Sequence, residues 1–187
     1  MDMVLLLWIL AGVSAVILLY LWAVYNSFIG SRNQVKTDFA DIDVQLKRRA
    51  SLIENLVAVV REYAKHEKTT FTDVTKARTS LEKSHSAKES AAADNMLTSA
   101  LKSLFAVSEA YPELLASKNY QALQADIKET ENLIANYRET YNQSVLSFNT
   151  KVQIFPNLMV AKLFGFGEEE LFTPAPMDRS DIKIKAV

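Results

Sequence analysis

The chain opens with an unbroken apolar stretch. Residues 3–24 contain no charged side chain, and a helix of that length rises about 33 Å, enough to cross a hydrocarbon layer of roughly 30 Å. Aromatic side chains that favour membrane interfaces lie near its two ends: Trp8, Tyr20, Trp22 and Tyr25. The pattern predicts a transmembrane anchor over residues 1–26. Cleavage as a signal peptide is disfavoured, because no basic residue precedes the stretch and no small-residue cleavage site follows it.

Beyond the anchor, an apolar seam recurs every three or four residues. Most of its positions from Val35 to Leu81 are apolar, which predicts one long helix, either continuous with the anchor or hinged at Gly30. Two charged residues fall on the seam, Arg49 and Glu67. The favoured interpretation is that they lie at its edge or pair with another helix. The alternative is a buried charged pair that fixes helix register.

Two further apolar stripes predict two more helices. The first covers residues 96–114 and follows a polar stretch, residues 82–93, that contains a turn unless its alanines keep it helical. Pro112 is expected to break this helix near its end. The second stripe covers residues 123–155 and ends at Pro156. Four asparagines recur along or near it, and they are either exposed or buried as hydrogen-bonding register markers.

The segment after the third stripe is the most apolar part of the chain outside the anchor. Residues 155–166 read FPNLMVAKLFGF, which predicts a short helix over residues 157–164, capped by Asn157 and terminated by Gly165. It either closes the end of a helical bundle or forms an interfacial helix or oligomer contact. The candidate contact residues in it are Phe155, Leu158, Leu163, Phe164 and Phe166.

These patterns together predict an all-α fold. Neither glycine nor proline occurs between residues 31 and 111, which favours long helices over strands. Three apolar stripes leave water by facing one another, so we expect an antiparallel bundle of long helices with coiled-coil-like packing over residues 27–166. Residues 167–187 are predicted to form an extended, mobile tail. The first helix is longer than the second, so part of its seam is expected to stay uncovered and to favour a homo-oligomer.

Several motifs resemble those of one family. The sequence carries YN at 25–26, IDVQLKRR at 42–49, YAKHE at 63–67 and FPNLMVAKLFGF at 155–166, and this set is similar to the LemA family of bacterial membrane proteins. The resemblance implies a helical bundle behind an N-terminal anchor, with no established enzyme activity and no cofactor. It also shows departures, since the family commonly has proline at Glu54, glycine at Glu62 and a small residue at Tyr137. A kink near Glu54 is therefore either straightened here or kept by packing.

Composition and motifs give no sign of an enzyme. The chain has no cysteine, 21 basic and 22 acidic side chains, which excludes thiolate chemistry and does not suggest a nucleic-acid partner. His66 and Glu67 do not complete a zinc motif, because Thr70 stands where a second histidine is needed. No phosphate-binding loop or catalytic triad motif is present. We therefore predict no enzyme activity, no metal and no cofactor. A hydrolase built on His66 and Glu67 is the weakest alternative.

The basic residues suggest an orientation and a contact. None precedes the anchor, whereas Arg32, Lys36 and the run Lys47, Arg48 and Arg49 follow it. The positive-inside rule then places the N-terminus outside the cell inner membrane and the bundle in the cytoplasm. The run is either a solvated helix face or a contact for an acidic protein or anionic lipid, with protein contact favoured.

Two functions follow as hypotheses. The first is a non-enzymatic, membrane-anchored scaffold that self-associates through its long helices, with the lipid bilayer as its other partner. The alternative is a monomeric adaptor for a membrane protease or signalling protein.

Overall fold

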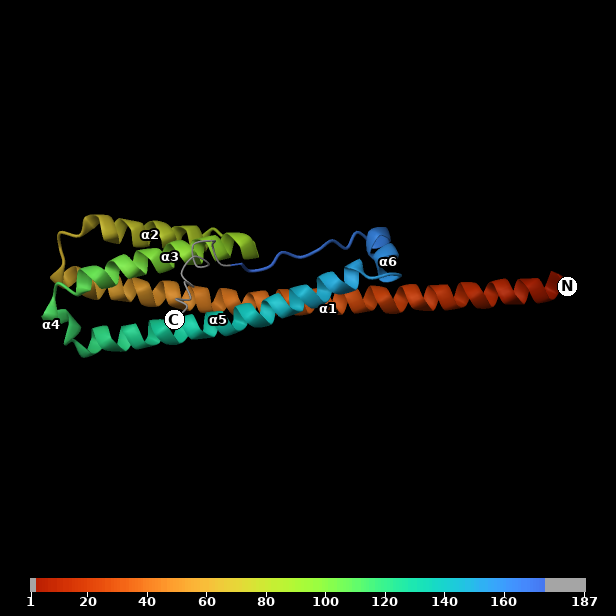
Figure 1. The fold of residues 1–187 in the computed structure, drawn as a ribbon, viewed down its shortest axis with the longest axis horizontal. Helices are drawn as coiled ribbons and strands as arrows, with labels where there is room; N and C mark the ends of the chain where they lie inside the picture. Colours follow the sequence, from red (N-terminus) through yellow and green to blue (C-terminus); the bar gives the residue numbers. More distant parts are fainter. Residues whose placement is uncertain (1–2, 174–187) are drawn as a thin grey trace, which may run out of the picture. The chain divides into compact units, whose positions relative to one another are not determined.

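The computed structural model describes residues 3–173, and all regular structure in that range is helical (Figure 1). The order is α1 (Met3–Tyr63), α2 (Lys68–Glu82), α3 (Ala87–Ser108), α4 (Pro112–Leu115), α5 (Lys118–Gln153) and α6 (Asn157–Phe164). These residues form two compact units. The first unit contains residues 3–37 and 143–169, and the second contains residues 38–142 and 170–173. The all-helical prediction is confirmed for the described residues.

Helix α1 joins the apolar stretch to the seam without a break. It runs from Met3 to Tyr63, so Gly30 lies inside the helix and does not act as a hinge. A Cβ at Gly30 would meet no atom within 4 Å, so no close packing requires glycine there. At position 54, glutamate supplies the backbone N–H that a proline would lack. At position 62, glutamate favours the helix more than a glycine would. Both residues are therefore compatible with the continuation of α1.

The prediction of one helix from Val35 to Leu81 is wrong in one respect. Residues 64–67 form a turn, and α2 begins as a new helix at Lys68. The seam weakens at this point, because Tyr63 is exposed and Glu67 is polar. A stripe spaced by three and four residues fits one rod or two packed helices equally well, so the periodicity hid the break.

Helices α2 and α3 pack against each other as a helical hairpin. The turn between them begins at Lys83. Ser86 caps α3, since its hydroxyl accepts a hydrogen bond from the Glu89 backbone N–H at 3.2 Å. The Glu89 carboxylate in turn accepts one from the backbone N–H of His85 at 2.8 Å. This reciprocal capping starts α3 well before the predicted apolar stripe, so the alanine-rich stretch is helical.

The α1 seam forms the core of the second unit. Its apolar positions there are nearly inaccessible: Ile42, Leu46, Ile53, Leu56 and Val60. Helix α5 contacts α1 through the rings of Phe39 and Tyr141, whose centroids lie 5.7 Å apart, and through Arg48 and Glu129 at 3.9 Å. The expected uncovered length of seam is not found in this unit, because the chain's own helices cover it.

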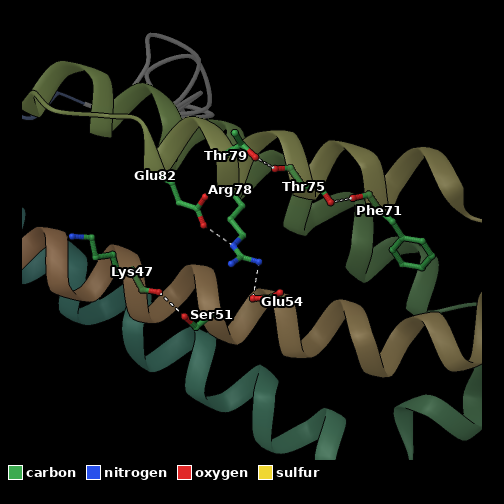
Figure 2. Close-up of polar contacts among 8 residues, drawn as sticks. All are labelled: Lys47, Ser51, Glu54, Phe71, Thr75, Arg78, Thr79 and Glu82. Carbon is green, nitrogen blue, oxygen red and sulfur yellow. Dashed lines mark hydrogen bonds and ion pairs between the residues drawn. The ribbon is translucent and has the colours of Figure 1, made fainter.

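Arg78 ties α2 to α1 (Figure 2). Its guanidinium lies 2.6 Å from the Glu54 carboxylate of α1 and 3.0 Å from that of Glu82 on α2. Hydrogen bonding to Glu54 is the main reason why the pKa of Arg78 is raised. All three side chains are partly exposed, so the bridge orients the two helices more than it stabilises them.

The first residues after α6 are held by asparagines of α5. In the second unit, Asn142 donates to the Phe172 carbonyl at 3.1 Å and accepts from the Phe172 N–H at 2.8 Å. Phe172 is buried, with the Arg138 guanidinium 5.1 Å from its ring centre. Phe172 therefore belongs to the core, although it lies in the predicted tail. The rest of that tail, residues 174–187, lies outside the described residues.

A buried ion pair lies among the apolar side chains of the second unit. Arg49 of α1 is only 2% exposed, and its guanidinium lies 2.7 Å from the carboxylate of Asp94 on α3. The alternative of a buried charged pair therefore holds for Arg49. The Arg49 Nε and Nη2 atoms have no hydrogen-bond partner within the described chain. Burial raises the pKa of Asp94, and this effect outweighs the attraction of Arg49 that lowers it. We infer that the pair contributes more to helix register than to stability.

Removing one member of this pair is expected to destabilise the chain strongly. Asp94→Leu leaves the Arg49 charge buried without its partner, at a cost of about 3–5 kcal/mol in the free energy of unfolding. The double variant Arg49→Met with Asp94→Leu removes both charges, and we expect stability equal to or above that of the wild type. Urea unfolding of the full chain in detergent, followed by helical circular dichroism, measures both. A double variant as unstable as the single one would contradict this view.

The raised pKa of Asp94 also predicts a pH dependence. The folded state holds the Asp94 proton more tightly than the unfolded state does. Protonation of Asp94 therefore contributes to the free energy of unfolding below the ordinary pKa of 3.8, and this contribution is lost as pH rises through the raised pKa. The stability of the wild type relative to Asp94→Asn should therefore increase as pH falls from 7. Paired urea titrations at several pH values measure this difference. If the stability difference between the two proteins shrinks on acidification, the attraction of Arg49 outweighs the effect of burial on the pKa of Asp94.

Candidate interaction surfaces

Helix α6 packs against α1 through aromatic rings in the first unit. The Tyr25 ring meets those of Phe164 and Phe166 with centroids 5.0 and 5.7 Å apart. Phe28 is almost completely buried, and its ring centre lies 5.0 Å from that of Phe166 and 6.5 Å from that of Phe148 on α5. These edge-on and tilted contacts are favourable geometries for aromatic pairs. They fix the position of α6 on α1.

A polar contact positions the start of α6. The Tyr20 hydroxyl donates a hydrogen bond to the Asn157 side-chain oxygen at 2.7 Å. The prediction that Asn157 caps α6 is therefore wrong, because Pro156 occupies the capping position and no side chain caps the helix. The predicted end is confirmed. Gly165 has a φ of 72°, in the left-handed region that favours glycine.

The outward face of α6 is apolar and uncovered. Of the predicted contact residues, Phe155 is 79% exposed, Leu163 is 70% exposed and Phe164 is about half exposed. Met159, which the sequence did not single out, is 66% exposed. Leu158 and Phe166 are half-buried. Exposed apolar side chains therefore recur between residues 154 and 164.

Polar and ionic contacts lie on the other side of the aromatic rings along α1. Lys151 of α5 donates to the Ser31 hydroxyl at 2.6 Å, and Arg32 pairs with Glu169 at 2.9 Å. Asn149 binds the backbone N–H and C=O of Glu169 at 2.8 and 2.9 Å. The contacts to α1 in this unit thus follow an order along the helix. The hydrogen bond of Tyr20 comes first, the aromatic contacts follow, and the polar and charged contacts lie farthest from the start of α1.

The structure separates the predicted basic run. Lys47 and Arg48 are exposed, whereas Arg49 is buried against Asp94 and does not take part in a surface contact. Lys47 pairs with Asp43 of the same helix at 2.6 Å, and Arg48 pairs with Glu129. The charges of the two exposed residues are therefore partly balanced, which makes them weaker candidates for a partner contact.

A basic groove, which sequence reasoning missed, lies in the second unit. It has a volume of about 890 Å³, and side chains of α1, the following turn, α2 and α3 line it: Arg61, Lys65, Lys68, Phe71, Lys76 and Met96 are among them. The Arg61 guanidinium lies 5.0 Å from the Phe71 ring centre. The basic residues at 61, 65 and 68 were a usable signal, but Met96 is too distant in sequence to be assigned to the groove without the fold.

The lysines are the side chains of this groove that are best placed to bind a ligand. Three threonine hydroxyls along α2 already donate to carbonyls one turn earlier, and Figure 2 shows two of them, Thr75 to Phe71 and Thr79 to Thr75. Lys65 and Lys68 form no salt bridge with any described residue. The groove thus combines the apolar side chains of Phe71 and Met96 with the unpaired charges of Lys65 and Lys68, which suits an acidic, partly apolar ligand.

The chemistry for catalysis is sparse. His66 is exposed in the turn before α2, and His85 is exposed in the turn before α3. Within residues 3–173, no group of three or more histidine, aspartate or glutamate side chains is placed to hold a metal ion. The groove is lined by basic, apolar and hydroxyl-bearing side chains.

One described helix is long and apolar enough to cross a membrane. It is α1, and none of the residues in its most apolar stretch is buried. A core helix of a soluble protein would hide that stretch from solvent, so α1 differs from such a helix in this part.

Comparison with known proteins identifies relatives of bacterial origin. The magnetosome protein MamQ 2 of Paramagnetospirillum magneticum is 25% identical, over 81% of this chain and 65% of that protein. The chain thus spans about two thirds of the length of the MamQ relatives. Protein LemA of Metamycoplasma hominis is 26% identical, over 84% of this chain and 76% of that protein. The sequence profile of the LemA family matches residues 38–185. The chain therefore belongs to the LemA family, as its motifs indicated.

Proposed function

We propose that this protein is a membrane-anchored helical adaptor without catalytic activity. In this proposal, α1 crosses the membrane and the second unit binds an acidic segment of another protein in the basic groove. The observation that carries the proposal is the dual character of α1. Its residues 3–20 are exposed on every side, whereas its seam from Ile42 to Val60 is buried on one side by other helices. One helix thus has a part suited to lipid and a part suited to a folded bundle.

The proposal includes antiparallel, coiled-coil-like packing of the second unit. The contacts between α1 and α5 support it, since Phe39 meets Tyr141 and Arg48 meets Glu129. The residue numbers rise along α1 as they fall along α5. This arrangement keeps the seam inside one chain, which leaves the outer helix faces available to a partner.

Burial of the seam also bears on oligomerisation. The sequence favours self-association because the first helix is longer than the second, which predicts an uncovered part of the seam. In the second unit the seam is buried. Exposed apolar side chains are numerous in the anchor part of α1 and in the segment around α6. We therefore favour a monomeric adaptor over a self-associating scaffold. We further propose the inner membrane, with the N-terminus outside and the bundle in the cytoplasm, on the basis of the basic residues after the anchor segment.

Charge reversal in the groove tests the adaptor function. We expect Lys65→Glu with Lys68→Glu to weaken binding of a fluorescent, glutamate-rich amphipathic peptide at least about tenfold, or about 1.4 kcal/mol. Lys102→Glu with Lys128→Glu changes the net charge equally at exposed sites outside the groove, and it should bind like the wild type. Fluorescence anisotropy of the full chain in nanodiscs gives both affinities. Equal weakening in the two variants would assign the effect to overall charge.

The mass of the chain in a membrane tests the monomeric state. A chain of 21.0 kDa should contribute one copy per nanodisc when discs are assembled with lipid in large excess, because its long seam is already covered. Mass photometry or native mass spectrometry measures the copy number. A stable dimer that persists on dilution would contradict the adaptor proposal and favour the self-associating scaffold.

A further inference from the structure

We propose that α6 is a second membrane-contacting element, an amphipathic helix that lies in the interfacial layer of the bilayer beside α1. Its occupant is lipid, which its outward apolar face contacts. This inference rests on the proposed membrane anchoring by α1 and assigns a ligand to a separate surface.

The composition of the outward face is the first argument. Ile154, Phe155, Met159 and Leu163 are substantially exposed. Phe164 packs edge-on against Tyr25 of α1 and is still about half exposed. Burying apolar side chains of this size away from water is favourable. Soluble monomers rarely leave large apolar patches exposed to water. The face therefore requires an apolar neighbour.

The position of α6 along α1 identifies that neighbour. Helix α6 contacts Tyr20 and Tyr25 of α1, and Phe166, just after α6, contacts Phe28. These α1 residues lie at the end of the apolar stretch, and tyrosine is enriched at membrane interfaces. The three residues span roughly 12 Å of helix. The next contacts along α1 are ionic or polar, through Ser31 and Arg32. This order from apolar through aromatic to charged matches the order from hydrocarbon to water in a bilayer.

The polar groups of α6 agree with an interfacial position. Asn157 accepts the Tyr20 hydroxyl bond, so a polar side chain at this depth is satisfied. Lys162 is the one charged residue of the helix, and its long side chain allows the ammonium group to reach the headgroups. A second copy of the chain is a rival occupant. However, the exposed face of α6 adjoins the end of the uncovered anchor stretch of α1, so the same lipid that surrounds α1 covers both without a further partner.

The chain contains no cysteine, so single labels report on single positions. Met159→Cys and Leu163→Cys place an environment-sensitive NBD fluorophore on the outward face of α6. Leu146→Cys is the matched control, because Leu146 is a 63% exposed apolar residue of the same unit on α5. Val13→Cys, in the middle of the apolar stretch, reports on anchoring. Each full-length variant is reconstituted into phosphatidylcholine vesicles with and without nitroxide-labelled lipid, and iodide serves as the aqueous quencher.

We expect nitroxide lipids to quench the fluorophores at positions 159 and 163 at least about twofold more than the one at position 146, with iodide showing the reverse order. Accessibility of positions 159 and 163 to iodide alone would overturn the inference. Protection of both positions from iodide and from lipid nitroxides would also overturn it, in favour of a protein neighbour such as a second copy. If Val13 itself is not quenched by lipid, the anchoring proposal fails as well, so the two failures are distinguishable.

Discussion

The structure depends on how the apolar surface of α1 is removed from water. The helix carries apolar side chains around its whole circumference over residues 3–20 and along one side from Ile42 to Val60. A helix that is apolar on all sides is stable in lipid, whereas a single apolar stripe needs packed neighbours. The two parts of α1 share one helical backbone geometry, and their side chains determine whether each part suits lipid or the core of a helical bundle. The other helices of the second unit supply the cover for the stripe.

Polar groups inside that cover restrict how the helices align. Arg49 and Asp94 come from α1 and α3, and their pairing satisfies the Asp94 carboxylate only when those two positions face each other. Burial of two charges is costly, so such a pair selects one alignment more than it adds stability. Asn142 acts similarly toward the chain after α6, because its amide matches both the N–H and the C=O of Phe172. Each contact penalises a shift of one helical turn.

The sequence predicted the helices well because their signals are local. Periodicity gave the three main apolar stripes, and Gly165 marked the end of α6. The turn at residues 64–67 was missed because no glycine or proline marks it and the spacing of apolar residues continues beyond it. Asp94 was not recognised as the partner of Arg49, because it follows a polar stretch that was expected to hold a turn. For the sites, apolar content identified α6, but only the fold shows which of its residues face outward and which residues line the groove.

The chemistry of the groove favours recognition that depends on tethering. Lys65 and Lys68 supply charge, while Phe71 and Met96 supply a modest apolar floor. Exposed charges chiefly raise association rates and are screened by salt, so they give moderate affinity by themselves. In the proposed adaptor, anchoring in a membrane compensates for this, because a partner held in the same bilayer meets the groove at a raised effective concentration. Under this proposal, moderate affinity for an acidic segment is sufficient for an adaptor.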